Sequence, residues 1–434
     1  MPIAFSRKDL NSTVWFSLEK GIQLFAGVFI IPKIFNTLGT IDIGKLHFVE
    51  ALLGMFTPLF FLGLSAISIR EMVLHPKTCE KIIGTTFTMR LLSWIILSIG
   101  ILCYLIFTKN VALFSLYLIL LFGYLFRLTD VFEFYFLAKK QAKFIFISKI
   151  TSLIIILLLQ YYGVTHHLDV LYFAKVLALD FLIQGAIYGL ALLINKGFSF
   201  KKLSISISLG KQLLIMSFPL MISSGLIMLY IGIDELFLKY YFSDHANGVF
   251  GSVQYLVIGL SWTIGFAIIN ALYPSLAESY NQDNSTYKIK FRQLTIAMII
   301  LGLGIAVFYI IFGNYILNTY FSDQYAEAKS PLQIFCWSPL FIFMGMLYEK
   351  HVLTINKLEH EVYRFTVGCI CNLILCYILI PLYYINGAAL AVLISHFITN
   401  IVYPFLQLSF NHRSYFSQNK NNICTYFYLL LLLF

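Results

Sequence analysis

The sequence predicts an all-α protein that crosses a membrane about twelve times. Of its 434 residues, 60% are hydrophobic and only 12% are charged, whereas a soluble domain carries roughly 25% charged residues. Apolar stretches of about 20 residues, the length that a helix needs to cross a bilayer, follow one another along almost the whole chain. The connections between them are too short to form a soluble domain.

The twelve predicted spans fall into two sets of six. The first set lies near 14–35, 46–69, 86–107, 111–137, 144–162 and 170–194. The second set lies near 211–239, 248–275, 293–317, 331–353, 363–382 and 387–409. Prolines within or at the ends of spans indicate helices that can bend. They are Pro32, Pro58, Pro219, Pro274, Pro339 and Pro404.

The distribution of basic residues predicts the orientation. Most of the 30 Lys and Arg residues, with Arg90 and Arg364 counted at helix ends, fall on one side of the membrane when the loops alternate. Those on the other side are Lys33, Lys45, Lys109, Lys239 and Lys329. Because basic residues resist translocation, we expect both ends of the chain to be cytoplasmic. Topology thus accounts for the net charge of +10, and no nucleic-acid partner is needed to explain it.

The chain is expected to consist of two parallel six-helix bundles. Gly44–Leu53 resembles Gly248–Val257 at an offset of 204 residues, and both segments open the second span of their half. An even number of spans per half gives both halves the same orientation. The predicted domains are 1–195, a cytoplasmic linker 196–210, 211–410, and a cytoplasmic or interfacial tail 411–434.

Charged residues inside the spans are the candidate functional residues. Each costs about 2.5–3.5 kcal/mol at a helix centre, so such groups normally face water or a partner. The basic candidates for substrate binding are Lys20, Arg127, Lys149 and Lys175. The carboxylates that are candidates for ion coupling are Asp130, Asp180 and Asp234. A cavity lined by basic groups would favour an anionic substrate.

Structural explanations exist for several of these charges. Lys20 lies close enough to the inner end of its span for the ammonium group to reach the interface. Arg127 and Asp130 are three residues apart on a helix and would neutralise each other. Asp234 lies towards the outer end of its span and would be an interface residue.

Enzyme motifs are absent from the sequence. It contains no Gly-x-Ser-x-Gly, no phosphate-binding Gly loop and no His-Glu-x-x-His. The seven cysteines show no metal-type spacing. A membrane polymerase or ligase would need a larger outer loop than the longest one here, roughly 318–330. We therefore expect no catalytic residues, metal or cofactor, although transport could be coupled to H⁺ or Na⁺.

Several segments resemble the O-antigen flippases (Wzx), the polysaccharide branch of the multidrug/oligosaccharidyl-lipid/polysaccharide (MOP) exporter superfamily. The first span and its loop contain Glu19-Lys-Gly-Ile-Gln, Ile31-Pro-Lys-Ile, Leu38-Gly and Ile43-Gly44, where the family often has an aromatic residue at the position of Ile43. The eighth span begins Gly248-Val-Phe-Gly-Ser-Val-Gln and ends Tyr273-Pro-Ser-Leu-Ala-Glu278. The twelfth span begins with 386–395.

This resemblance implies a MATE-like fold in a bacterial inner membrane. The implied activity is translocation of an undecaprenyl-pyrophosphate-linked oligosaccharide from the cytoplasmic to the periplasmic leaflet by alternating access. Further partners that we expect are membrane lipid, a polysaccharide polymerase and a chain-length regulator. The alternatives are a cation-coupled multidrug exporter, which would favour acidic over basic cavity residues, a lipid II flippase, and the polymerase or ligase disfavoured above.

Overall fold

The computed structural model describes residues 7–107, 111–194, 197–355, 357 and 359–407. The predicted tail 411–434 and the side chain of Lys20 lie outside this part of the chain. The described residues form helices joined by short connections and contain no strand. They divide into two compact units between Met228 and Leu229, and the division falls inside one long helix, Ile207–Tyr241.

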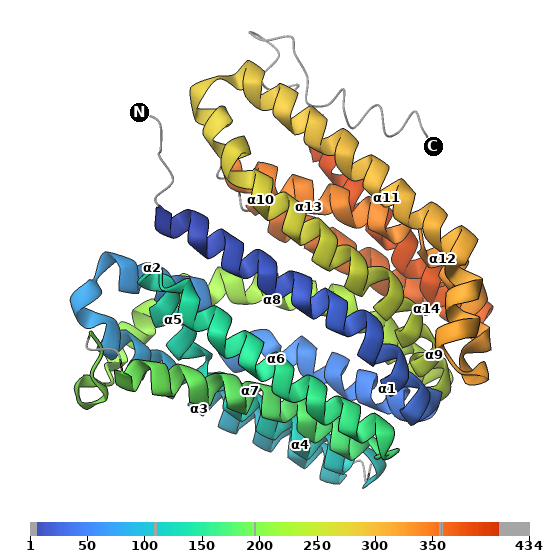
Figure 1. Cartoon of the computed structure of the whole chain (residues 1–434), viewed down its shortest axis with the longest axis horizontal. Coiled ribbons are helices and arrows are strands. Elements are labelled where there is room, and N and C mark those ends of the chain that lie inside the picture. The colour runs from blue at the N-terminus through green and yellow to red at the C-terminus, as the bar shows by residue number, and fades with distance from the viewer. Residues whose placement is uncertain (1–6, 108–110, 195–196, 356, 358, 408–434) are drawn as a thin grey trace. The chain divides into compact units, whose positions relative to one another are not determined.

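The first unit is a bundle of seven α-helices and the first part of an eighth. The α-helices are α1 (Arg7–Phe61), α2 (Leu64–Leu74), α3 (Cys79–Phe107), α4 (Val111–Arg127), α5 (Val131–Ala138), α6 (Ala142–Thr165), α7 (Val170–Ile194) and α8 (Ile207–Tyr241). Short 3₁₀ turns are η1 (Pro76–Thr78), η2 (Leu128–Asp130) and η3 (Phe200–Lys202). Helix α7 packs against both α4 and α6, while α1 packs against α6 and α2 against α5 (Figure 1).

Residues with positive φ interrupt the helices of the first two predicted spans at two places. Gly39 has φ of 70° and kinks α1 between them. A second break separates α1 from α2, where Leu62 and Gly63 have φ of 57° and 61°. A β-carbon on Gly63 would lie 2.8 Å from the backbone nitrogen of Met221. Glycine is therefore needed at 63 both for its φ and for the close approach of α8.

The second unit continues α8 and adds six α-helices. These are α9 (Asp244–Gln254), α10 (Leu260–Gln282), α11 (Asn284–Tyr320), α12 (Lys329–Phe335), α13 (Ser338–Thr354) and α14 (Glu359–Phe397). The other elements are the π-helical segments η4 (Tyr255–Gly259) and η6 (Ile398–Val402) and the 3₁₀ helix η5 (Asp323–Ala328). Helix α13 packs against α10 and α11, and α12 packs against α14 (Figure 1).

The predicted helical fold with about twelve spans in two bundles is confirmed. In the described residues, nine helical segments are long and apolar enough to cross a membrane, or ten with the pair Asp323–Phe335 and Ser338–Thr354, bent by 51°. Two of the nine, Phe29–Leu74 and Glu359–Gln407, contain kinks, at Gly39 and Tyr384, and each provides two predicted spans. The domain boundaries drawn around 196–210 stay a prediction.

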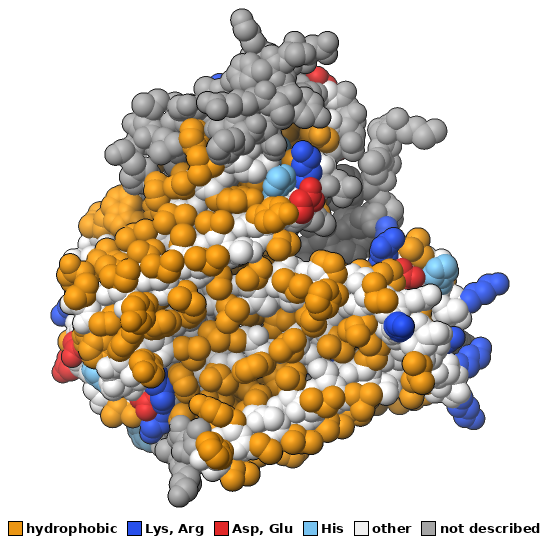
Figure 2. Space-filling model, turned by 180° about the vertical axis from the view of Figure 1, so that it is seen from behind, with side chains coloured by type: hydrophobic (Ala, Val, Ile, Leu, Met, Phe, Trp, Pro, Cys, Tyr) orange, Lys and Arg blue, Asp and Glu red, His pale blue; other side chains and the backbone are white. Residues whose placement is uncertain are grey.

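The exposed side chains suit a lipid environment. Large apolar residues such as Ile96, Phe107 and Ile194 in the first unit and Ile311 in the second are more than 60% exposed. Figure 2 shows hydrophobic side chains over much of the face in view. Water would oppose this exposure at about 25 cal/mol per Å² of apolar surface, whereas lipid does not.

Candidate functional site: a charged network in the first unit

A local interruption of the fourth predicted span positions two charged side chains, Arg127 and Asp130. Helix α4 ends at Arg127, the 3₁₀ turn η2 follows, and α5 begins after Asp130. The Thr129 hydroxyl donates to the Phe126 carbonyl at 2.7 Å. Gly185 of α7 leaves room for this turn, since a β-carbon there would lie 2.0 Å from Thr129 Oγ1. Side chains three residues apart lie on the same side of a 3₁₀ turn, so Arg127 and Asp130 are brought together.

Arg127 and Asp130 form a long ion pair. Arg127 Nε lies 3.6 Å from Asp130 Oδ2, and the two side chains are 36% and 29% exposed. That distance exceeds the usual range for an N–H···O hydrogen bond. The Arg127 guanidinium also lies 5.2 Å from the ring centres of Phe61 and Phe181. Aromatic contacts therefore help to hold the guanidinium in place.

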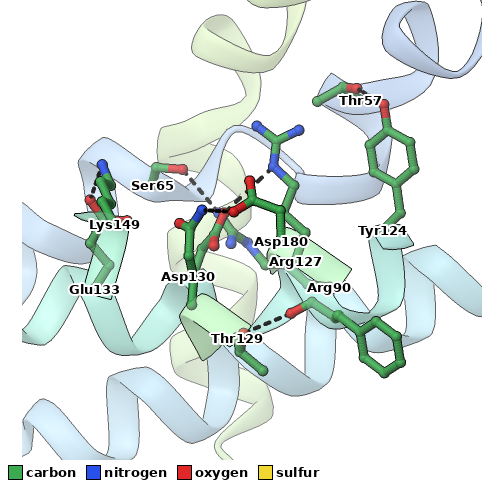
Figure 3. A network of polar contacts seen from close by, with 12 residues as sticks. Thr57, Ser65, Arg90, Tyr124, Arg127, Thr129, Asp130, Glu133, Lys149 and Asp180 are labelled. Carbon is green, nitrogen blue, oxygen red and sulfur yellow. Dashed lines mark hydrogen bonds and ion pairs between the residues drawn. The ribbon is translucent and has the colours of Figure 1, made fainter. Parts of the chain in front are cut away.

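A second ion pair joins α5 to α6. The Lys149 ammonium lies 3.1 Å from Glu133 Oε1, and both side chains are largely buried. This pair is shorter and less exposed than Arg127–Asp130. Figure 3 shows both pairs within one group of polar residues. Two of the four basic candidates thus lie in this group, each next to a carboxylate.

Arg90 of α3 is a member of the network that the sequence analysis missed. Its side chain is enclosed, with the residue only 1% exposed. Nη2 donates to Ser65 Oγ at 2.9 Å, and the guanidinium lies 5.1 Å from the Phe61 ring centre and 4.9 Å from that of Phe134. The sequence predicts a span that begins near residue 86, which puts Arg90 at its inner end. The helix begins at Cys79, which places Arg90 about three turns inside.

Asp180 of α7 is held by two hydrogen-bond donors. The Ser152 hydroxyl donates to Asp180 Oδ1 at 2.5 Å, and Gln184 Nε2 donates to the same oxygen at 2.8 Å. Lys175, on the same helix, is exposed and joins no ion pair within the described residues. The structure therefore brings Arg127, Lys149 and Asp180 into one region and leaves Lys175 outside the network (Figure 3).

Asp234, the remaining candidate, lies in the second unit. It is fully buried on α8, and Gln254 Nε2 donates to its Oδ2 atom at 2.6 Å. Its Oδ1 atom has no hydrogen-bond partner among the described residues, and no ion pair there joins it to a basic side chain. Asp234 is fully buried, which argues against the predicted position at the membrane interface.

The second unit contains its own buried arginine. Arg364 of α14 is 2% exposed. Nη2 donates to Glu361 Oε2 at 2.6 Å and Nη1 donates to Asn400 Oδ1 at 2.6 Å. The guanidinium also lies 4.4 Å from the Phe365 ring centre. Arg364, predicted near a helix end, is hydrogen-bonded to Glu361 and Asn400 and so links α14 to the π-helical segment η6.

The first-unit network is suited to binding charge rather than to covalent chemistry. It holds three basic groups and three carboxylates: Arg90, Arg127, Lys149, Asp130, Glu133 and Asp180. The formal charges balance. Within the described residues, no group of three or more His, Cys, Asp or Glu side chains could hold a metal ion.

Comparisons with known proteins agree with this architecture. The family model "Polysaccharide biosynthesis protein" matches residues 10–280, and the MatE model matches residues 219–378. The chain is 27% identical over 268 residues to the capsular polysaccharide biosynthesis protein CapF of Staphylococcus aureus. That match covers 60% of this chain and 64% of CapF, so slightly less than two thirds of the relative is spanned.

Solved transporters share the fold at low sequence identity. A multidrug resistance MATE family transporter of the MOP superfamily, in an inward-facing conformation, superposes with a TM-score of 0.70 at 14% identity, covering 96% of this chain and 98% of the other. A MOP superfamily transporter from Pyrococcus furiosus, described as having a binding pocket of reversed polarity, gives a TM-score of 0.65 at 14% identity, covering 92% and 96%. The family predicted from the sequence motifs is confirmed: this chain belongs to the polysaccharide biosynthesis protein family, and it has the fold of MOP superfamily transporters.

Proposed function

We propose that this protein is a flippase for an undecaprenyl-pyrophosphate-linked oligosaccharide. It would carry the headgroup from the cytoplasmic to the periplasmic leaflet of a bacterial inner membrane by alternating access, with both ends of the chain in the cytoplasm. The observation that carries the proposal is the match of the polysaccharide family model to residues 10–280, which include Arg90, Arg127 and Lys149. Basic side chains within spans suit a diphosphate, because guanidinium and ammonium groups bind phosphate oxygens well.

The membrane potential supports movement in this direction. Carrying two negative charges outwards across an inside-negative membrane is favourable by about 4–5 kcal/mol for every 100 mV. The polyprenyl chain would remain in lipid during this movement, so only the charged and sugar portions need a polar path. A polysaccharide polymerase and a chain-length regulator would act on the glycan after it reaches the outer leaflet.

A multidrug exporter is the second candidate, favoured by the match of the MatE model to residues 219–378. The two functions differ in the charge of the cargo. A drug exporter of this fold would carry organic cations, for which Arg90, Arg127 and Lys149 are unfavourable neighbours. Three carboxylates balance these three basic groups, so it is the family match rather than the net charge of the network that favours an anionic cargo.

Deleting the gene tests the proposal in the cell. The expected result is loss of a surface glycan and accumulation of its lipid-linked unit on the cytoplasmic side. The purified protein in liposomes should expose a fluorescent lipid-linked oligosaccharide to an enzyme outside the vesicle. If the liposomes instead move a cationic dye and leave the lipid-linked oligosaccharide in place, the drug-exporter function is correct and the flippase proposal is wrong.

A further inference from the structure

The ion pair between Arg127 and Asp130 differs from the other ion pair of the charged network, Lys149–Glu133. It is longer than Lys149–Glu133, at 3.6 Å against 3.1 Å, and its side chains are more exposed. We propose that Asp130 is the resident counter-ion of an anion-binding Arg127, and that Asp130 takes up a proton when a diphosphate replaces it. This inference rests on the proposed function, because it assumes an anionic cargo.

Arg127 can keep its position when it exchanges partners. Phe61 and Phe181 lie at equal distances of 5.2 Å from its guanidinium carbon, and neither contact depends on Asp130. The long contact to Asp130 gives up little when it is broken, because only a well-made, short ion pair offsets the desolvation of its charges. Arg127 is therefore the basic group of this network that an incoming phosphate can bind at the lowest cost.

The other two basic groups are less available. Arg90 is 1% exposed and is enclosed by its contacts with Ser65, Phe61 and Phe134. Lys149 lies at hydrogen-bonding distance from Glu133. A diphosphate that approaches the network would thus meet Arg127 first and would compete with Asp130 for it.

A diphosphate that displaces Asp130 from Arg127 adds negative charge to the network, and a proton on a carboxylate offsets part of it. The charged groups that face Asp130 are Arg127 and Glu133 on its own segment, Arg90 from α3 and Lys149 from α6, with Asp180 of α7 in the same region. The network is already neutral, so an added diphosphate leaves an excess of negative charge in a region of low dielectric, where like charges repel strongly. Protonation of one carboxylate removes part of that excess.

Asp130 is the carboxylate that would accept the proton. Glu133 retains Lys149 at 3.1 Å. Asp180 retains the hydrogen bonds from Ser152 and Gln184. Asp130 alone loses its ion-pair partner when phosphate takes Arg127. By linkage, a proton on Asp130 must then strengthen diphosphate binding as much as bound diphosphate favours the proton.

Calorimetry on the purified full-length protein tests this linkage. The probe is citronellyl diphosphate N-acetylglucosamine, a soluble diphosphate esterified at both ends, whose phosphates do not titrate near neutral pH. Titrations in buffers of different ionisation enthalpy give the number of protons taken up per molecule bound. We expect net proton uptake by the unaltered protein, and an affinity for the probe about tenfold stronger at about pH 6 than at about pH 8.

Two variants with the same change of charge identify the carboxylate. Asp130→Asn mimics the protonated state, so it should abolish proton uptake and raise the affinity at high pH to the low-pH value. Glu133→Gln removes the neighbouring carboxylate and should leave proton uptake intact. Arg127→Gln should weaken binding about tenfold or more.

The possible failures are distinguishable. Binding of the probe without proton uptake by the unaltered protein overturns the linkage and leaves the proposed function standing. Proton uptake that survives in Asp130→Asn and disappears in Glu133→Gln overturns the assignment to Asp130. Absence of binding by the unaltered protein contradicts the anionic cargo itself, and both proposals fall together. The measurement on the unaltered protein decides whether diphosphate binding is linked to proton uptake, even if a variant does not fold.

Discussion

Gly345 of α13 lies so close to Asn400 of η6 that a β-carbon on the glycine would stand 2.2 Å from Asn400 Oδ1. The same β-carbon would be 2.8 Å from Arg364 Nη1. Glycine is therefore what allows the hydrogen bond between Arg364 and Asn400, at 2.6 Å, to form beneath α13. This contact ties the start of α14 to the π-helical segment that follows its end.

Gly345→Ala is expected to destabilise the second unit. The methyl group has to displace either the Asn400 amide or the Arg364 guanidinium, and overpacking of this kind costs about 1–3 kcal/mol. Gly304→Ala in α11 is the matched control, because a β-carbon there meets nothing within 4 Å. That control should be neutral or stabilising by up to about 1 kcal/mol through helix propensity. Thermal unfolding in detergent compares the two variants, and equal melting temperatures would contradict the packing argument.

Arg90→Lys is expected to lower stability even though it conserves charge. A lysine cannot donate to Ser65 while placing a planar cation against Phe61 and Phe134. The lost hydrogen bond to a charged group is worth about 1.5–3 kcal/mol. Arg70→Lys, at an exposed position of α2, should leave the melting temperature unchanged. A similar loss in both variants would mean that the enclosure of Arg90 is unimportant.

The Lys149–Glu133 pair is expected to show energetic coupling between α5 and α6. Lys149→Gln and Glu133→Gln each leave a largely buried charge without its partner, whereas the double variant leaves none. A double-mutant cycle on unfolding free energy should give a coupling of about 0.5–3 kcal/mol. The pair Arg127–Asp130, with a longer N···O distance and more exposed side chains, should give a smaller coupling energy. The reverse order would contradict the structural reason for choosing Arg127 as the anion-binding group.

The sequence was sufficient to predict the fold class and the number of spans, because lipid requires long apolar helices and composition reports these directly. It also identified Arg127, Asp130 and Lys149, since a charge within an apolar run is visible without a structure. It could not find Arg90, whose depth depends on where α3 begins. Nor could it show which carboxylate lies beside which basic group, because pairs such as Lys149–Glu133 join different helices.

Asp283, between α10 and α11, caps the N-terminus of α11, and this cap depends on pH. Its carboxylate accepts hydrogen bonds from the backbone N–H groups of Ser285 and Thr286, at 3.0 and 3.1 Å, and from both hydroxyl groups. These bonds hold the pKa of Asp283 well below its usual range. A lowered pKa in the folded state means that the stabilisation is complete above the unfolded value of about 3.9 and is lost as the pH falls through the folded value.

Asp283→Ala should therefore increase hydrogen exchange at the first turn of α11, and the difference from the unaltered protein should be constant across neutral pH. The difference should shrink only in acid, where the cap of the unaltered protein is itself protonated. Asp283→Asn, which also caps helices, should retain most of the protection and lose its pH dependence. A difference that changes between about pH 5 and about pH 8 would contradict the lowered pKa.

Neutralising Asp180 and Asp234 tests ion coupling. Asp234 is the stronger candidate, because a fully buried carboxylate without an ion-pair partner in the described part of the chain favours a bound proton or cation. Asp180→Asn and Asp234→Asn keep an oxygen to accept from Gln184 and Gln254, so both proteins should fold. Asp234→Ala would instead leave the Gln254 amide without its acceptor, at about 1–3 kcal/mol.

The double variant Asp180→Asn with Asp234→Asn is expected to reduce glycan export and to weaken its dependence on a proton or sodium gradient, while the proton uptake proposed for Asp130 remains and the melting temperature stays near that of the unaltered protein. Asp323→Asn, at an exposed position in η5, controls for the loss of a carboxylate. Export that continues unchanged, with the same response to both gradients, would show that these two carboxylates serve only the packing of α7 and α8. Ion coupling would then have to depend on Asp130 in the first unit.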